Sequence, residues 1–123
     1  MNLVDSSGWL AFFADTKNAE RFSVPLQDVD RLLVPTVVMY EVTKALLRER
    51  GEEAAIIGQA HMQLGTIADL NAELAVNAAA LSLEKHLPMA DSIILATARA
   101  FDATVWTQDD HFKGLAKVKY FIV

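Results

Sequence analysis

Short apolar runs and helix-type patterns alternate along the whole chain. Apolar runs of strand length predict five strands, at Asn2–Val4, Leu32–Val34, Thr66–Leu70, Thr104–Thr107 and Tyr120–Val123. Stretches rich in strong helix formers predict helices at Ser7–Ala14, Val37–Arg50, Glu52–Leu64, Ala72–Lys85, Met89–Phe101 and, briefly, Asp109–Leu115. The strands are too apolar to face water on one side. The pattern therefore predicts an α/β fold, with a mostly parallel sheet covered by helices on both faces.

One domain accounts for the whole chain. A length of 123 residues fits a single buried core, and no repeat, low-complexity stretch or Gly/Ser linker interrupts it. We therefore expect one domain over residues 1–123. Apolar residues make up 53% of the chain, which is more than a small monomer usually buries. This excess predicts a homodimer or a protein partner.

Several classes of protein and site are excluded by composition. The chain has no cysteine, so disulfide frameworks and thiolate metal sites are ruled out. Its start has no basic segment and meets an acid at Asp5, unlike a signal peptide. The longest uncharged apolar run, Leu32–Tyr40, is too short to span a membrane. We expect a cytoplasmic protein that does not bind membranes.

Four carboxylates fall where an α/β sheet places its ligands, at the ends of strands or the starts of helices. Asp5 ends the first predicted strand, and Asp109 follows the strand Thr104–Thr107. Glu41 lies one turn into the helix after Pro35, and Asp91 opens an apolar helix. The fold can bring all four together.

Each acid also has a purely structural interpretation. Asp5 and Asp109 are suited to cap the helices that follow them, and Glu41 can pair with Lys44 on the same helix. Asp91 fits such a role least well. It precedes the apolar run Ser92–Ala96, and a buried carboxylate is costly without hydrogen bonds or a cation.

Four clustered carboxylates favour a bound divalent cation, because their mutual repulsion otherwise raises their pKa values. Oxygen ligands select hard ions, which predicts Mg²⁺ or Mn²⁺. The cation also answers an objection from the net charge of −5, which argues against nucleic-acid binding. Without the four acids the charge is −5 + 4 = −1, and a bound cation attracts phosphate.

Four motifs in order resemble the PIN-domain ribonucleases, and among them the VapC-type toxins of toxin–antitoxin pairs. They are Val4-Asp5-Ser6-Ser7 with Trp9-Leu10, Tyr40-Glu41-Val42 after Pro35, Met89-Ala90-Asp91-Ser92-Ile93-Ile94-Leu95-Ala96-Thr97-Ala98, and Thr107-Gln108-Asp109-Asp110-His111-Phe112. The resemblance covers nearly the whole chain. It implies a three-layer α/β/α sandwich with a five-stranded sheet, an RNA substrate and a cognate antitoxin protein.

The resemblance also implies the catalytic residues, which are Asp5, Glu41, Asp91 and Asp109. We assign all but Glu41 as direct or water-mediated metal ligands; Glu41 either completes the shell or orients the attacking water. Ser6 and Thr107 are candidates to hold the ligands in place. Some relatives carry a further Asp where this sequence has His111. That histidine is a weaker ligand, an RNA contact or simply a surface residue, and we favour the last.

Basic residues and an aromatic-rich helix are the candidates for contacts with substrate or partner. Candidates to contact phosphates are Lys44, Arg48, Arg50, Lys113, Lys117 and Lys119. Trp9, Leu10, Phe12 and Phe13 make the first helix aromatic, which favours core packing over an antitoxin contact.

Two other functions remain as alternatives. One is a PIN-like module that binds RNA or protein without cutting. The other, a phosphate-accepting receiver domain, fits poorly because Asp5 stands alone before two serines.

Overall fold

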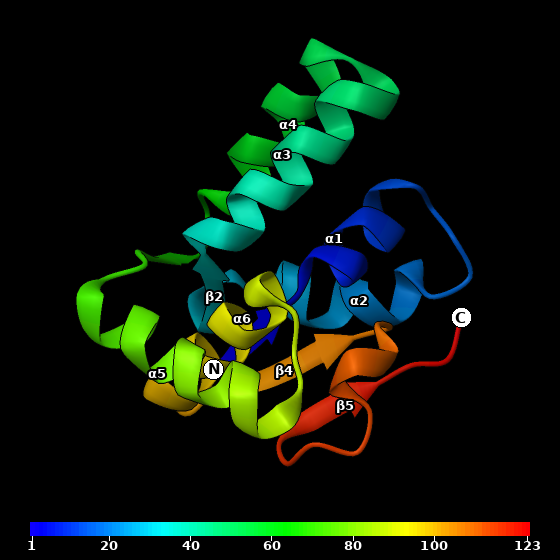
Figure 1. Cartoon of the computed structure of the whole chain (residues 1–123). Coiled ribbons are helices and arrows are strands. Elements are labelled where there is room, and N and C mark those ends of the chain that lie inside the picture. The colour runs from blue at the N-terminus through cyan, green and yellow to red at the C-terminus, as the bar shows by residue number, and fades with distance from the viewer.

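A five-stranded sheet forms the centre of the computed structural model, which describes residues 1–123 (Figure 1). Its strands are β1 (Asn2–Val4), β2 (Leu32–Pro35), β3 (Thr66–Ala68), β4 (Thr104–Thr107) and β5 (Val118–Tyr120). They lie in the order β3-β2-β1-β4-β5, and all four neighbouring pairs are parallel. The predicted parallel sheet is confirmed.

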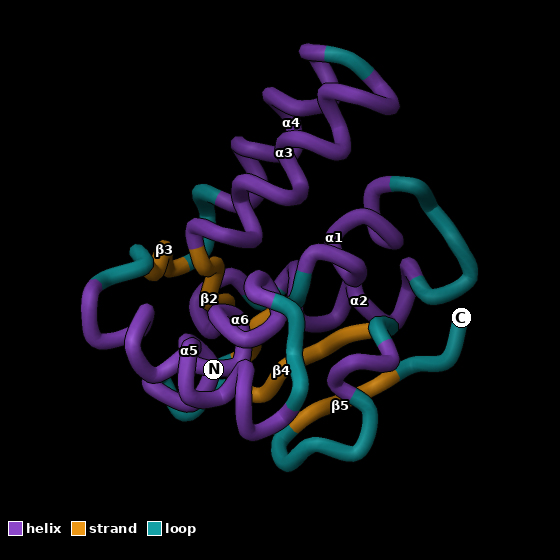
Figure 2. The backbone as a smooth tube through the Cα atoms, viewed as in Figure 1, coloured by secondary structure: helices purple, strands orange, loops and turns teal.

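Six α-helices connect the strands, as the tube in Figure 2 shows. They are α1 (Ser6–Phe13), α2 (Ala19–Gln27), α3 (Thr36–Arg50), α4 (Glu52–Met62), α5 (Ala72–Lys85) and α6 (Met89–Ala100). Two 3₁₀ turns, η1 (Val29–Arg31) and η2 (Asp110–Phe112), complete the chain. None of the helices is long and apolar enough to cross a bilayer.

The strand order explains why the helices form two layers. The chain moves from β1 to β2 to β3 in one direction, then returns past both to reach β4. Because parallel crossovers are right-handed, the connections before β3 and the connection after it cover opposite faces of the sheet. Helices α5 and α6 lie on the face toward the viewer in Figure 1. The result is the expected three-layer α/β/α sandwich.

Helices α3 and α4 form a hairpin that stands out from the sandwich (Figure 1). Gly51 separates them with a φ of +91°, a conformation that glycine adopts without steric cost. Arg50, beside this turn, donates a 2.7 Å hydrogen bond to the backbone oxygen of Phe13 at the end of α1. This contact connects the end of α3 to the end of α1.

The core between the layers is continuous and apolar. Its largest fully buried side chains include Trp9, Phe22, Phe112, Leu3, Leu26 and Ile94. Trp9 therefore packs in the core, as expected, while Leu10, Phe12 and Phe13 are only partly buried against it. The indole Nε1 of Trp9 has no hydrogen-bond acceptor. Its ring lies edge-on to His61, with centroids 5.2 Å apart.

The structure corrects three of the expected elements. Helix α2 was not predicted at all, and the last strand runs over Val118–Tyr120 rather than Tyr120–Val123. The brief helix expected at Asp109–Leu115 is only the 3₁₀ turn η2.

Candidate metal centre

Strands β1 and β4 lie side by side, yet the chain leaves them toward opposite edges of the sheet. Such a switch point opens a crevice at the carboxyl ends of the two strands, where α/β proteins bind ligands. Asp5 follows β1 directly, and Asp109 lies two residues after β4. The sheet topology thus brings together acids that are more than 100 residues apart in sequence.

Asp5 is buried and fully engaged in hydrogen bonds. Its side chain is the N-cap of α1, where Oδ1 accepts from the backbone N–H of Gly8 at 3.0 Å. The same oxygen accepts from the hydroxyl of Ser7 at 2.7 Å, and Oδ2 accepts from Thr107 at 2.6 Å. The capping interpretation and the site interpretation therefore both apply to this residue.

Burial is the main influence on the charge of Asp5. Removal from water raises the pKa of Asp5 from 3.8 to about 6. The hydrogen bonds from Thr107, Ser7 and Gly8 act in the opposite direction, and the charge of Asp109 adds a smaller increase. Three donors do not offset the cost of an anion in this position. A bound cation would therefore stabilise the ionised form of Asp5.

Asp91 opens α6, where the helix has no side-chain cap. Its side chain is only 13% exposed, and burial followed by repulsion from Asp109 raises the pKa of Asp91 to about 6. The charge of Glu41 adds to the increase, while His111 lowers it. The pKa of Asp91 is thus raised by two of the other predicted site acids, Asp109 and Glu41.

Asp109 and His111 meet Asp91 in a tight group. Nδ1 of His111 lies 2.9 Å from Oδ2 of Asp91 and 3.1 Å from Oδ1 of Asp109. These contacts raise the pKa of His111, mainly through the charge of Asp109. His111 was expected to be a surface residue, and its side chain is indeed 54% exposed. It nevertheless points at two site carboxylates, so the surface interpretation is incomplete.

Glu41 reaches the same edge from the first turns of α3. Its Oε1 accepts a 2.5 Å hydrogen bond from the hydroxyl of Ser6. Ser6 and Thr107 were expected to support the site acids, and each is bonded to one of them. Neither Glu41 nor Asp5 belongs to the tight group of Asp91, Asp109 and His111. The charge of Glu41 nevertheless raises the pKa of Asp91, and the charge of Asp109 raises the pKa of Asp5.

The residues present fit a divalent cation. Asp91, Asp109 and His111 each offer a ligand atom, and these atoms all lie within 4.8 Å of one another. Asp5 is buried and Asp91 is partly buried, and a bound cation would offset the burial and repulsion that raise both pKa values. Carboxylate oxygens are the ligands of Mg²⁺ and Mn²⁺. The ligand atoms and the negative charge at this site therefore both favour a divalent cation such as Mg²⁺ or Mn²⁺.

Two supporting residues were missed in the sequence. The hydroxyl of Ser7 bonds Asp5 and also accepts a 3.2 Å hydrogen bond from the backbone N–H of Gln108. Asn18 is buried, and its amide donates to the Gln108 side chain and to the backbone oxygen of Ile122, both at 3.0 Å. Ser7 could have been found from its place in the first helical turn. Asn18 gave no signal, because its partners are about 90 or more residues away.

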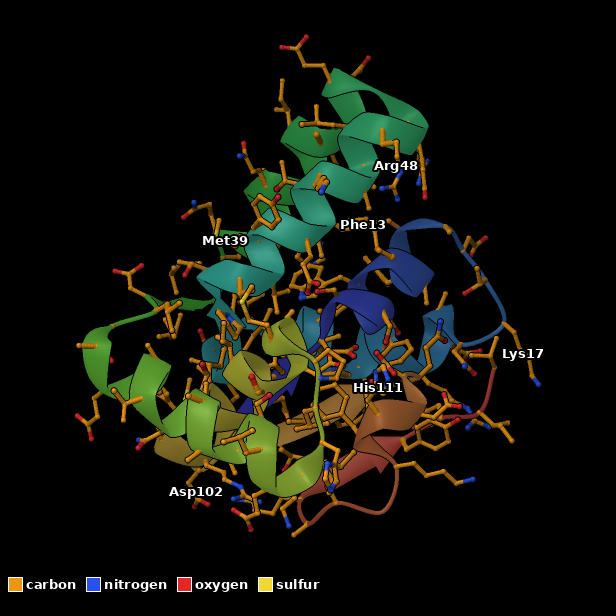
Figure 3. The ribbon with its side chains drawn as sticks, in the orientation of Figure 1. Phe13, Lys17, Met39, Arg48, Asp102 and His111 are labelled. Carbon is orange, nitrogen blue, oxygen red and sulfur yellow. The ribbon has the colours of Figure 1, made fainter.

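The basic residues proposed to contact phosphates are not all near the site. Lys44 and Arg48 follow Glu41 at i+3 and i+7, so they continue along the same side of α3. Lys117 instead pairs with Asp102, beyond the far end of α6 from Asp91. Figure 3 shows Asp102 well apart from His111. Lys117 is therefore too far from the site acids to contact a phosphate bound beside them.

Lys113 and Lys119 are engaged with aromatic rings. Lys119 lies over the ring of Trp106, with its Nζ 4.4 Å from the centroid, and Lys113 lies 5.8 Å from that of Tyr120. Arg50 donates a hydrogen bond to the backbone oxygen of Phe13, beside the α3–α4 turn. Lys44 also lies over a ring, 5.6 Å from the centroid of Tyr40, and Arg48 pairs with Glu49. Lys44 and Arg48 are nevertheless the best placed of the set, because they lie on the same helix face as Glu41.

Comparison with known proteins gives one family match. The model of the PIN domain family matches residues 3–118. No curated protein is similar enough in sequence to count as a match.

Solved structures agree with the family match in fold. A toxin–antitoxin complex from Klebsiella pneumoniae superposes with a TM-score of 0.85 at 18% identity, over all of both chains. VapC20 of Mycobacterium tuberculosis, described as a toxin that cleaves the sarcin–ricin loop, gives 0.79 at 18% identity, over 100% of this chain and 98% of that one. A DNA-bound VapBC from Salmonella typhimurium gives 0.73 at 13%, over 99% and 98%. At these identities the likeness concerns the fold alone.

Proposed function

Because the chain belongs to the PIN domain family, we propose that it is a metal-dependent endoribonuclease, the toxin of a type II toxin–antitoxin pair. The observation that carries the proposal is the meeting of Asp5, Asp91, Asp109 and Glu41 around the crevice between β1 and β4. Of the solved structures that share the fold, one is described as a toxin that cleaves the sarcin–ricin loop and another as a DNA-bound VapBC. The single PIN domain spans residues 1–123.

In this proposal Asp91, Asp109 and Asp5 hold one Mg²⁺ or Mn²⁺, either directly or through water. A cation bound there supplies electrophilic stabilisation of the charge on the phosphodiester and lowers the pKa of water. Thr107 and Ser7 fix Asp5 in position, and their hydrogen bonds lower its pKa against the larger effect of burial. These two donors position a ligand without contacting substrate.

Glu41 is the residue best placed to act on the attacking water. Its second oxygen is free of hydrogen bonds, while Oε1 is held by Ser6. The negative charges of Glu41 and Asp91 affect one another, so the two acids face a common space. We assign Glu41 to orient the water or accept its proton.

Phosphate contacts are assigned to Lys44 and Arg48. Both are exposed on α3, on the stripe that begins at Glu41. A line of cations leading away from the carboxylates suits the backbone of an RNA strand that enters the site. These contacts position the strand and carry no base preference.

The proposed partners are an antitoxin protein and a second copy of the chain. Partly buried apolar side chains of α1, among them Leu10 and Phe13, line a groove with Leu46 of α3, which suits an apolar segment of an antitoxin. On α5 and α6, Leu83 is 82% exposed and Met89 is 76% exposed, which favours an interface between copies. The Klebsiella pneumoniae and Salmonella typhimurium structures are described as toxin–antitoxin or VapBC assemblies. We place the protein in the cytoplasm.

The proposal is tested by cleavage of a mixed RNA pool. The wild-type chain, cleared of any co-purified partner, is assayed with Mg²⁺, with Mn²⁺ and with EDTA. Asp91→Asn keeps the size of the side chain and removes its charge. Asp110→Asn makes the same change at an exposed neighbour outside the metal-binding group.

We expect metal-dependent cutting by the wild type and by Asp110→Asn, and a loss of at least about a hundredfold in Asp91→Asn. Cutting that persists in EDTA would overturn the metal-dependent mechanism. If the folded wild type cuts no RNA with either ion, the chain is a PIN-like module that binds RNA or protein without cleaving.

A further inference from the structure

His111 is the one nitrogen donor in a group that otherwise offers carboxylate oxygens. Its Nδ1 lies between Asp91 and Asp109, at 2.9 and 3.1 Å from one oxygen of each. Figure 3 labels this histidine on η2, the short turn that follows β4. The ring therefore adds a nitrogen donor to the two carboxylates.

The two distances match the spacing of adjacent ligands around one ion. Two ligand atoms bound at right angles, each about 2.1 Å from a six-coordinate cation, are about 3.0 Å apart. The contacts from Nδ1 to both oxygens lie within about 0.1 Å of that value. When Nδ1 carries a proton, it can donate to both carboxylate oxygens at these distances. An ion bound to all three would replace that proton.

The backbone fixes the position of His111. Oδ1 of Asp109 caps the turn η2 by accepting a 3.0 Å hydrogen bond from the backbone N–H of His111. The next residue, Phe112, is fully buried and anchors the turn in the core. The Asp109 side chain and the start of the His111 side chain therefore share one rigid turn. This preorganises Nδ1 beside the carboxylate oxygen.

We propose that Nδ1 of His111 is a direct ligand of the divalent cation, and that this nitrogen makes the site prefer Mn²⁺ to Mg²⁺. The inference rests on the proposed function, because it concerns the same metal centre. Mg²⁺ takes oxygen ligands almost exclusively, while imidazole suits transition-metal ions. An all-carboxylate site has no such reason to discriminate against Mg²⁺.

The test is spectroscopic and does not depend on RNA cleavage. Mn²⁺ is added to the metal-free full chain, and electron spin-echo envelope modulation detects whether a nitrogen nucleus is bound to the ion. His111→Ala removes the ligand, and His111→Asp replaces it with an oxygen ligand. His86→Asn is the matched control, because His86 is exposed, lies outside the metal-binding group and has a left-handed backbone that asparagine tolerates.

We expect nitrogen modulation in the wild type and in His86→Asn, and none in the two His111 variants. The ratio of Mn²⁺ to Mg²⁺ affinity, measured by competition titration, should fall by about tenfold or more in His111→Asp. Thermal unfolding of each metal-free variant checks that it is folded.

Two results would overturn the inference, and they separate it from the proposed function. If the wild type binds Mn²⁺ without nitrogen modulation, His111 is not a ligand, while the metal centre of the proposed nuclease stands. If neither the wild type nor His111→Asp binds Mn²⁺ at millimolar concentration, the metal centre itself fails, and the proposed mechanism fails with it.

Discussion

The hydroxyl of Thr107 donates a 2.6 Å hydrogen bond to Oδ2 of Asp5, and it joins the ends of two strands that are about 100 residues apart. Oγ1 of Thr107 in turn accepts a 2.9 Å hydrogen bond from the backbone N–H of Asp109. One fully buried hydroxyl thus positions two of the proposed site acids. Serine and threonine at this point supply both a donor and an acceptor, which no apolar residue of similar shape can do.

Replacing Thr107 by valine should therefore destabilise the protein and disturb the site. The substitution keeps the shape and leaves a buried carboxylate oxygen and a backbone N–H without their partner. We expect a loss of ~1–3 kcal/mol in the free energy of unfolding, measured by urea denaturation. Thr107→Ser is the control, since it retains the hydroxyl, and it should lose less. Equal losses in the two variants would show that packing of the methyl group matters more than the hydrogen bonds.

Asp5 should make the metal-free protein less stable as the pH rises. Its pKa is about 6 in the folded chain and near 3.8 when unfolded, so the folded state binds the proton more tightly. The corresponding stability is present below pH 3.8 and is lost as the pH rises to about 6. The shift corresponds to on the order of 2–3 kcal/mol.

Asp5→Asn mimics the neutral acid and isolates this effect. Nδ2 of the asparagine cannot accept from Thr107, so the variant loses that hydrogen bond at every pH. Its stability relative to the metal-free wild type should nevertheless rise by about 2–3 kcal/mol between pH 4 and pH 7. Its Oδ1 can still accept from Gly8 and Ser7, so the cap of α1 is retained. Chemical denaturation of both proteins without metal, at pH 4, 5, 6 and 7, measures the difference. A difference that does not change with pH would contradict the raised pKa.

The fold was predictable wherever the local pattern and the tertiary structure agree. Strands β1, β2 and β4 are buried apolar runs, and α6 follows a long helical pattern behind Pro88. Helix α2 was missed because Pro25 lies inside it and polar residues precede it. Proline usually ends a helix, yet here Phe22 and Leu26 are fully buried and hold the segment in place. Tertiary packing outweighs the local signal at this point.

The bounds of the last strand are likewise determined by tertiary contacts and not by the local sequence pattern. Residues 120–123 look more strand-like than Val118 and Lys119, but β5 is defined by its partner. Val118 pairs with Val105 and Tyr120 with Thr107, so β4 determines where β5 begins. Upstream of β5, η2 is kept short because Gly114 has a φ of +83° and turns the chain toward the strand.

The positions of the proposed site acids could be predicted because each follows a strand or opens a helix. What the sequence does not contain is which side chains finally meet. His111 is one residue past Asp110, and only the turn η2 determines that the histidine faces Asp91 while Asp110 faces solvent. Ser7 and Asn18 are similar cases, since their partners come from the opposite end of the chain.

Gly8 should not tolerate a side chain. A methyl group built there would lie 2.5 Å from Cγ1 of Val4 and 2.8 Å from the ring of Phe22, both fully buried. We expect Gly8→Ala to lower the free energy of unfolding by ~1–3 kcal/mol despite the better helix propensity of alanine. Because Gly8 donates to Asp5, the metal affinity should fall as well.

Gly58→Ala is the matched comparison. It makes the same change inside a helix, but the nearest atom is the end of a single leucine side chain, Cδ1 of Leu46. It should cost less, because a side-chain end moves more easily than the packed pair at Gly8. Thermal denaturation of both variants measures the contrast. A Gly58→Ala loss as large as that of Gly8→Ala would contradict the argument from close packing.

Stabilisation of the protein by metal should weaken as the pH falls. A cation binds ionised carboxylates, so protons compete for Asp5 and Asp91, whose pKa values are both about 6. One group with a pKa of 6 is mostly ionised at pH 7 and about nine-tenths protonated at pH 5, which lowers the apparent affinity by about tenfold. If both acids hold the ion, the reduction approaches about a hundredfold. The rise in melting temperature with Mn²⁺ should therefore be large at pH 7 and small at pH 5.

Two variants show whether this pH dependence comes from the site. In Asp91→Asn, Mn²⁺ should stabilise the protein little at either pH, because one ligand and its charge are gone. Asp110→Asn removes an equal charge from an exposed neighbour, so its response should follow that of the wild type at both pH values. Scans of melting temperature against Mn²⁺ concentration at the two pH values measure all three proteins. Equal stabilisation at pH 5 and pH 7 would mean that the ion binds groups with ordinary pKa values, outside the crevice between β1 and β4.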